Sequence, residues 1–276
     1  MLRERIITAL VLLALLIPAV LARSPLPFAL FTLAMMAAAG WEWARLCQLP
    51  RVACIAGGAA LGAACAWLGP LGLDLPVPAW VWGVVTALWV LGGGAMLRAG
   101  PPRVATWPRG LRFAIGWLLL AAAWFALVRL KALGLPMLVS VVIVVWAADI
   151  AAYFGGRRFG RRKLAPTISP GKSWEGVYSG AAFVIVVAFV GMSVFPRFGA
   201  GPDLYNALDE RLGLAGMVVA VLALVALEVL GDLVESLVKR AVGAKDSSGL
   251  LPGHGGVLDR VDALLPVLPA ALVLLG

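Results

Sequence analysis

Long apolar stretches separated by short charged segments make up most of the chain. Several of the nine stretches approach or exceed the ~20 residues that a helix needs to cross ~30 Å of hydrocarbon. They cover residues 6–22, 24–41, 52–73, 75–97, 113–128, 132–148, 177–196, 212–231 and 263–276. None shows the alternation typical of a membrane β-barrel strand. The pattern therefore predicts an all-α, polytopic integral membrane protein with about nine transmembrane helices.

The composition supports this prediction. Of the 276 residues, 62% are hydrophobic and only 13% are charged. A soluble fold of this size cannot bury so many apolar side chains, so a soluble enzyme, a disordered chain and a secreted disulfide scaffold are all excluded. Cys47, Cys54 and Cys65 lack the spacing of a metal or redox motif, and we expect them to pack as small apolar side chains.

The charge distribution predicts the orientation. The net charge of +9 would suggest nucleic acid in a soluble protein, but in a membrane protein it reflects the cytoplasmic bias of Lys and Arg. One set of alternate flanks holds 18 of the 23 basic residues; it comprises residues 1–5, 42–51, 98–112, 149–176 and 232–262. We therefore predict a multi-pass protein of the cell (inner) membrane with a cytoplasmic N-terminus and no nucleic-acid partner. A signal peptide is the alternative interpretation of the first stretch.

The polar residues predict two parts of the chain. Residues 1–110 are expected to form N-terminal transmembrane helices. Residues 111–276 are expected to form a C-terminal transmembrane catalytic domain, because the two largest polar segments, 149–176 and 228–262, both fall there on the predicted cytoplasmic side.

The segment 228–262 reads EVLGDLVESLVKRAVGAKDSSGLLPGHGGVLDRVD and holds six of the 14 acidic residues. Spacings of four, three and four residues place the following side chains on one face of a helix: Glu228, Asp232, Glu235 and Lys239. The opposite face is apolar, so the span 212–231 is expected to continue as an amphipathic helix. Carboxylates that begin inside an apolar span are costly and usually line a polar cavity, which favours a functional role.

The end of this segment combines glycines, carboxylates and basic side chains. Glycines let backbone amides approach an anion closely. Asp259 and Asp262 are three residues apart, so a helix that begins near Leu258 would present both carboxylates together. Grouped oxygen ligands suit Mg²⁺, which commonly bridges carboxylates and substrate phosphates. With the nearby basic residues, this pattern predicts transfer at phosphorus; these are Lys239, Arg240, Lys245 and Arg260.

Two weaker signals remain. His254 lies between glycines in a polar loop and is expected to bind phosphate or orient a ligand, whereas a zinc site is not expected because no second histidine exists. The basic cluster at 157–163 fits either a topology signal with attraction to anionic lipid headgroups or phosphate binding. The run SPGKS at 169–173 resembles the end of a Walker A loop but lacks its first glycine. Lys172 and Ser173 could still contact phosphate, with Glu175 orienting one of them.

These residues resemble a known family. The segment 231–262 is similar to the C-terminal motif of phosphatidate cytidylyltransferases, also called CDP-diacylglycerol synthases. The matching residues are Gly231-Asp232, Glu235-Ser236, Lys239-Arg240, Lys245-Asp246, PGHGG at 252–256 and Asp259-Arg260-x-Asp262. A second stretch of that family is matched by Asp149, Tyr153, Gly156, Gly160 and residues 169–176. Gly171, Ser173 and Ala263 depart from the residues usual in the family. Residues in the N-terminal third match only the hydropathy pattern.

The resemblance implies Mg²⁺-dependent transfer of CMP from CTP to phosphatidate, giving CDP-diacylglycerol and pyrophosphate, by a homodimer in the lipid bilayer. A second cation stays open. The metal ligands would be Asp232 and Asp259, followed by Asp262 and Asp246. The catalytic residues would be Asp232, Lys239, Arg240, Asp246, Asp259, Arg260 and Asp262. The substrate-binding residues would be Asp149, Tyr153, Arg157, Arg158, Ser169, Lys172, Ser173, Glu175, Lys245, His254, Gly255 and Gly256.

Three other interpretations compete with this one. A transporter or channel would fit the intramembrane carboxylates, but the polar residues have no counterpart in the first half of the chain, where a transporter repeat would place them. Another CTP-using lipid enzyme, acting on an isoprenoid alcohol or an archaeal-type lipid, fits the same chemistry. An inactive relative is disfavoured by the full set of carboxylates.

Overall fold

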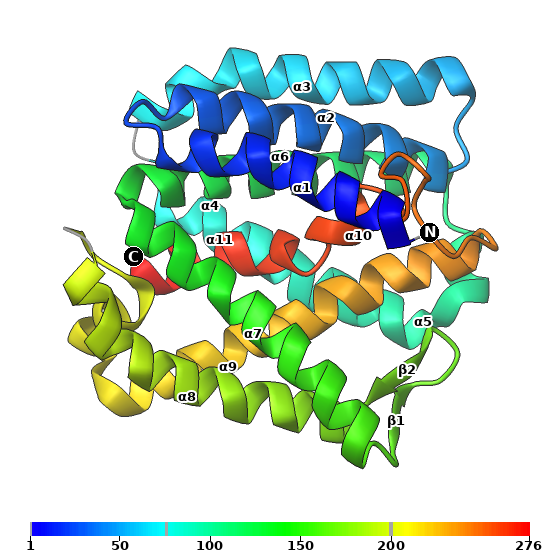
Figure 1. Ribbon diagram of the computed structural model, residues 1–276. Helices are drawn as coiled ribbons and strands as arrows, with labels where there is room; N and C mark the ends of the chain where they lie inside the picture. The colour runs from blue at the N-terminus through cyan, green and yellow to red at the C-terminus, as the bar shows by residue number, and fades with distance from the viewer. Residues whose placement is uncertain (1, 75–76, 199–200) are drawn as a thin grey trace.

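The computed structural model describes residues 2–74, 77–198 and 201–276 and forms a bundle of helices with one small hairpin (Figure 1). The first half contains α1 (Leu2–Leu21), α2 (Leu26–Leu46), α3 (Arg51–Asp74), α4 (Ala79–Ala87), the π-helix η1 (Leu88–Gly93), α5 (Gly94–Ala105) and α6 (Arg109–Leu133). The second half contains α7 (Leu135–Phe159), β1 (Lys163–Ala165), β2 (Ser169–Ser173), α8 (Trp174–Phe198), α9 (Leu204–Ala241), α10 (Leu258–Val261) and α11 (Leu264–Leu275).

The helices confirm the predicted class of protein. Within the described residues, eight helices are long and apolar enough to cross a membrane, with α4, η1 and α5 counted as one. The chain is therefore an all-α polytopic membrane protein. The ninth predicted span differs in size: α11 has 12 residues, or about 18 Å of helix. Its buried residues include Leu265–Leu272, and it packs against α4, α6 and α9, so it is a short helix enclosed by longer ones.

The polar segments gather at one end of the bundle. Figure 1 shows the N-terminus, the α2–α3 and α5–α6 connections, the β1–β2 hairpin and the α9–α10 loop at the same end, with the C-terminus at the other. These are the flanks that the charge count groups together. The grouping supports the segmentation into spans.

Close packing of α7 and α8 positions the hairpin. A Cβ atom on Gly176 or Gly180 would lie 2.8 Å from the Ala152 carbonyl oxygen or 2.9 Å from that of Ala148, so glycine lets the two backbones approach. The apolar span expected to end at residue 148 continues as α7 through Asp149 to Phe159. The hairpin that follows is antiparallel, with Lys163 opposite Ser173.

Helix α9 continues from the apolar span into the polar segment, as predicted. Its chain turns at Gly213, where φ is 71°, a conformation that glycine adopts at little cost. Residues 214–241 then extend for about 42 Å, more than the hydrocarbon thickness of ~30 Å. The three cysteines are buried free thiols, which confirms the packing prediction for them.

Candidate active site

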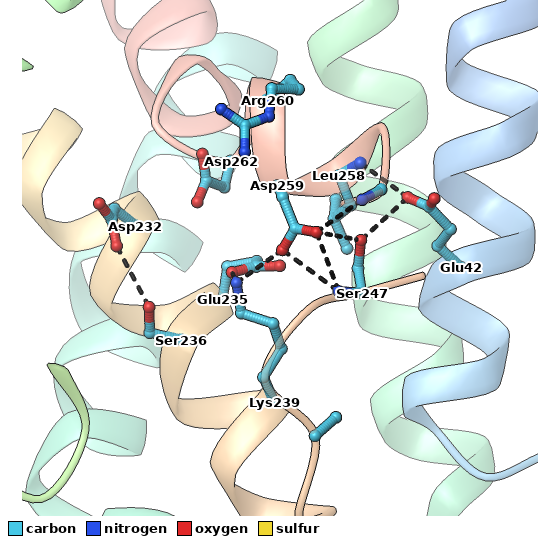
Figure 2. A network of polar contacts seen from close by, with 12 residues as sticks. Glu42, Asp232, Glu235, Ser236, Lys239, Ser247, Leu258, Asp259, Arg260 and Asp262 are labelled. Carbon is cyan, nitrogen blue, oxygen red and sulfur yellow. Dashed lines mark hydrogen bonds and ion pairs between the residues drawn. The ribbon is translucent and has the colours of Figure 1, made fainter. Parts of the chain in front are cut away.

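The acidic face of α9 meets α10 at the polar end of the bundle (Figure 2). The acidic side chains that α9 and the chain around α10 contribute lie together in Figure 2, and we call them the carboxylate cluster: Asp232, Glu235, Asp259 and Asp262. Lys239 joins the two helices, because its Nζ forms an ion pair with Glu235 and lies 2.6 Å from Asp259 Oδ1. Helix α9 therefore has the predicted acidic face, and this face lies opposite the second predicted group of carboxylates, Asp259 and Asp262.

Asp259 organises the loop before α10. Its Oδ2 accepts hydrogen bonds from the Gly256 N–H at 2.8 Å and from the Ser247 N–H and Oγ, each at 3.0 Å. Burial alone would raise the pKa of the Asp259 carboxyl, but the hydrogen bonds from Lys239 and Gly256 outweigh burial and lower that pKa to about 2. Asp259 is thus an ionised carboxylate that holds both α9 and the loop.

Lys172 connects the hairpin to α9. Its Nζ lies 2.6 Å from Asp232 Oδ2, and Asp232 Oδ1 also accepts a hydrogen bond of 3.2 Å from Ser236 Oγ. Burial lowers the pKa of Lys172, but the negative charges of Asp232, Glu228 and Asp149 more than offset it and raise that pKa. The two polar segments of the sequence therefore form one site.

Asp262 completes the carboxylate cluster. Its Oδ1 accepts one hydrogen bond, from the Ala263 N–H at 2.9 Å. Burial raises the pKa of the Asp262 carboxyl to about 7, and the negative charge of Asp232 adds to this rise. A cation between these two side chains would relieve both effects.

Glu42 on α2 belongs to the site, although it was not among the residues predicted for it. Its side chain is 0% exposed. Its oxygens accept hydrogen bonds from the Val257 N–H at 3.0 Å, the Leu258 N–H at 2.7 Å, Ser247 Oγ at 3.2 Å and Ser248 Oγ. An acidic side chain at the N-terminus of α10 satisfies otherwise unpaired amides, so Glu42 fixes both ends of the segment 247–258, which we call the glycine-rich loop.

The glycine-rich loop is folded by its own backbone. The Leu251 N–H donates to the Gly255 carbonyl at 2.8 Å, and Gly255 has a φ of 83°. A Cβ on Gly256 would overlap Ser247 Oγ and Glu42 Oε1. The His254 carbonyl accepts from Arg260 Nη2 at 2.7 Å and Nε at 3.1 Å. The loop residues that were predicted from the sequence to belong to the site therefore lie beside Asp259.

Three of the residues predicted for the site form hydrogen bonds to the backbone. Glu175 accepts hydrogen bonds from the Arg161 and Arg162 N–H groups at 3.0 Å and 3.1 Å. Ser173 Oγ accepts from the Gly176 N–H at 3.2 Å and caps the start of α8. Arg240 donates to the carbonyls of Ile168, at 3.3 Å, and Ala244, at 3.1 Å.

The other predicted residues lie around this centre. Tyr153 and Arg157 are exposed on α7, with Arg157 Nη1 3.4 Å from the Tyr153 hydroxyl. The remaining side chains are exposed, except for the partly buried Ser169 in β2; they are Asp149, Arg158, Lys245 and Asp246.

The residues present fit a hard divalent cation. No group of three or more His, Cys, Asp or Glu side chains within the described parts of the chain is already arranged to hold a metal. The carboxylate cluster nevertheless groups four carboxyl groups within reach of the ammonium groups of Lys172 and Lys239. Grouped carboxyl oxygens are the ligands that a hard divalent cation prefers, and its charge would favour the ionised form of Asp262, whose pKa is raised.

The carboxylate cluster, basic side chains and the glycine-rich loop meet at one end of a helical membrane bundle. This arrangement defines a membrane enzyme with an anion-binding site. The sequence assigns that enzyme to a family, because the model of the "Cytidylyltransferase family" matches residues 3–276. The chain belongs to this family and is a nucleotidyltransferase.

Curated relatives carry a more specific name. A phosphatidate cytidylyltransferase of Pseudomonas aeruginosa is 41% identical over 282 residues, which cover 100% of this chain and 97% of the relative. Proteins of the same name from Haemophilus influenzae and Bacillus subtilis are 52% identical over 136 residues and 37% identical over 170 residues. These alignments cover 49% and 59% of this chain, and 44% and 58% of the respective relatives.

Proposed function

We propose that the protein is a phosphatidate cytidylyltransferase that uses CTP and Mg²⁺ to form CDP-diacylglycerol and pyrophosphate. The observation that supports this proposal most directly is the carboxylate cluster, which lies beside Lys172, Lys239 and Arg260 at the polar end of a membrane bundle. The names of the relatives supply the substrate, phosphatidate.

In the proposed reaction, a phosphate oxygen of phosphatidate forms a bond to the α-phosphorus of CTP. The bond from that phosphorus to the bridging oxygen of the β-phosphate breaks, and pyrophosphate leaves. Phosphatidate is already anionic, so the principal barrier is repulsion between the two phosphates rather than proton removal. Bound Mg²⁺ would supply charge neutralisation on the triphosphate.

The residues divide these tasks. Asp232 and Asp262 would hold the metal with Asp259, and Asp246 lies nearby as a further candidate. Lys239, which pairs with Glu235 and Asp259, and Arg260, which donates to the His254 carbonyl, would neutralise phosphate. Lys172 would do the same from the hairpin, while Arg240, Ser173 and Glu175 keep the hairpin and the loops in place.

The proposed setting is the cytoplasmic face of the bacterial inner membrane, in a homodimer, with the acyl chains left in the bilayer. The charge bias toward the polar end supports this orientation. The substrates would then meet where the polar end borders the lipid.

Purified protein in detergent or nanodiscs, incubated with labelled CTP, Mg²⁺ and phosphatidate, should yield labelled CDP-diacylglycerol and pyrophosphate. Replacing phosphatidate by an isoprenoid alcohol or an archaeal-type lipid tests the neighbouring chemistry. Absence of product from phosphatidate with the wild-type protein would refute the proposal. Asp262→Asn should lower turnover at least about 100-fold, equivalent to about 2.7 kcal/mol of barrier, whereas the distant exposed Glu210→Gln should have no effect.

A further inference from the structure

An apolar cavity lies beside the carboxylate cluster, between η1, α5, α6 and α9. Its volume is about 100 Å³, several times the ~10–15 Å³ that one water requires. Its rim includes the exposed Leu88, Gly92 and Ile115, and its inner wall includes Gly231 and Glu235. The cavity therefore runs from the outer surface of the bundle toward the site.

A buried, unpaired cation lines this cavity. Arg112 on α6 is 3% exposed, and its Nε and Nη1 have no hydrogen-bond partner among the described residues. The indole Nε1 of Trp89, also buried in the lining, has no partner there either. Unpaired donors in an apolar setting are costly, so two neighbouring examples indicate a ligand that brings acceptor oxygens.

The helix at the rim has an unusual geometry that makes room. Residues 88–93 form a π-helical turn, a feature that often marks functional sites. A Cβ on Gly92 would meet no atom within 4 Å, whereas one on Gly93 would lie 3.2 Å from side-chain carbons of Leu230 and Val234. The glycine at 92 therefore leaves open space, while the glycine at 93 lets η1 pack on α9.

The inner wall touches the proposed reaction site. Glu235 lines the cavity and pairs with Lys239 of the carboxylate cluster. A Cβ on Gly231 would lie 2.5 Å from the Asp262 carbonyl oxygen. An amphiphile that entered between Leu88 and Ile115 would thus reach the residues assigned to catalysis without crossing the aqueous loops.

We propose that this cavity is the lateral binding site of the lipid substrate: Arg112 and Trp89 donate to oxygens of its phosphate and ester groups, and the first carbons of one acyl chain fill the space at Leu88, Gly92 and Leu119. Guanidinium groups bind phosphate through paired N–H donors, and the apolar lining suits the chain. The cavity holds a short chain segment, and the remainder lies against the exposed apolar surface. This inference rests on the proposed function, since the lipid is that enzyme's substrate.

Direct binding separates the two proposals. Labelled phosphatidate would be titrated into the full-length protein in phosphatidylcholine nanodiscs, without CTP. Arg112→Gln and Gly92→Phe should each weaken phosphatidate binding at least about 10-fold and raise its KM, while the KM for CTP and the elution volume stay unchanged. The matched controls are Arg103→Gln, an exposed arginine on α5, and Gly94→Phe, whose Cβ also meets open space but which does not line the cavity.

The possible results have distinct meanings. Wild-type binding by both Arg112→Gln and Gly92→Phe, in a preparation that forms CDP-diacylglycerol, would overturn the cavity proposal alone. Competition by uncharged diacylglycerol as strong as that by phosphatidate would overturn the role of Arg112. A wild-type protein that binds phosphatidate but forms no product from CTP would refute the proposed function and leave the cavity as a lipid site.

Discussion

Removing the negative charge of Glu42 should disable the site by loosening the loop that this side chain holds. The change is Glu42→Gln, which preserves size but replaces one acceptor oxygen by an NH₂ group. In the wild-type protein Oε1 accepts from the Val257 N–H and Oε2 from the Leu258 N–H. The amide can accept from only one of these backbone groups, so in either orientation the other N–H is left buried and unpaired.

The magnitude follows from these contacts. An unpaired buried donor costs about 1–3 kcal/mol, and hydrogen bonds to a charged group lose part of their ~1.5–3 kcal/mol when the acceptor becomes neutral. We therefore expect the ordered conformation of the loop to lose about 2–4 kcal/mol of stability. If catalysis requires that loop, a loss of 2–4 kcal/mol lowers turnover by a factor of roughly 30 to 1,000.

The assay combines turnover with hydrogen exchange of the loop. Glu42→Gln should lower kcat and speed amide exchange at residues 247–258, with little change in exchange along α7 and α8. Glu210→Gln, an exposed side chain in the first turns of α9 before the kink at Gly213, serves as the control. Normal kcat together with normal loop exchange in Glu42→Gln would refute the reasoning.

Three further changes test the site. Lys172→Met leaves Asp232 without the ammonium at 2.6 Å and should lower kcat/KM by about 10–100-fold, or about 1.4–2.7 kcal/mol. Lys172→Arg keeps the positive charge and should retain part of the lost kcat/KM. Equal kcat/KM values for the wild-type protein and both variants would contradict a role for this charge. Gly256→Ala should lower the free energy of unfolding by about 1–3 kcal/mol through overpacking, because its Cβ would overlap Ser247 and Glu42. Both Tm and turnover should fall, whereas the Cβ of the control Gly249→Ala meets no neighbour. Identical melting of these two variants would show that the loop can relax. Chelation by EDTA should abolish product formation and Mg²⁺ should restore it, so full activity in EDTA would rule out the metal.

The sequence predicted the parts of the site that depend on local spacing. Helical periodicity placed Glu228, Asp232, Glu235 and Lys239 on one face, and α9 has that face. The short spacing of Asp259 and Asp262 likewise anticipated α10. Such predictions succeed because a helix fixes the relation between residues three and four apart.

Glu42 could not be found in this way, because its partners at 247–258 lie more than 200 residues away in the sequence. The one local signal was a carboxylate between Trp41 and Trp43 at the end of an apolar stretch, where an acidic side chain is expensive unless it is paired. Ser173 and Glu175 show the converse limit. Ser173 fits phosphate binding and Glu175 fits the orientation of Lys172 or Ser173, but a hydroxyl or carboxylate beside a helix start equally fits a cap, and the structure uses them to hold backbone.

Helix α9 explains how one membrane enzyme can serve two substrates of opposite solubility. Asp232 faces Lys172 and the polar end of the bundle, while Gly231 and Val234 line the apolar cavity. Glu235 belongs to both environments, since it pairs with Lys239 and also borders the cavity. In the proposed reaction, CTP would therefore approach from the polar end and the lipid from the side. A single helix could bring their phosphates together without drawing either substrate out of the solvent that suits it.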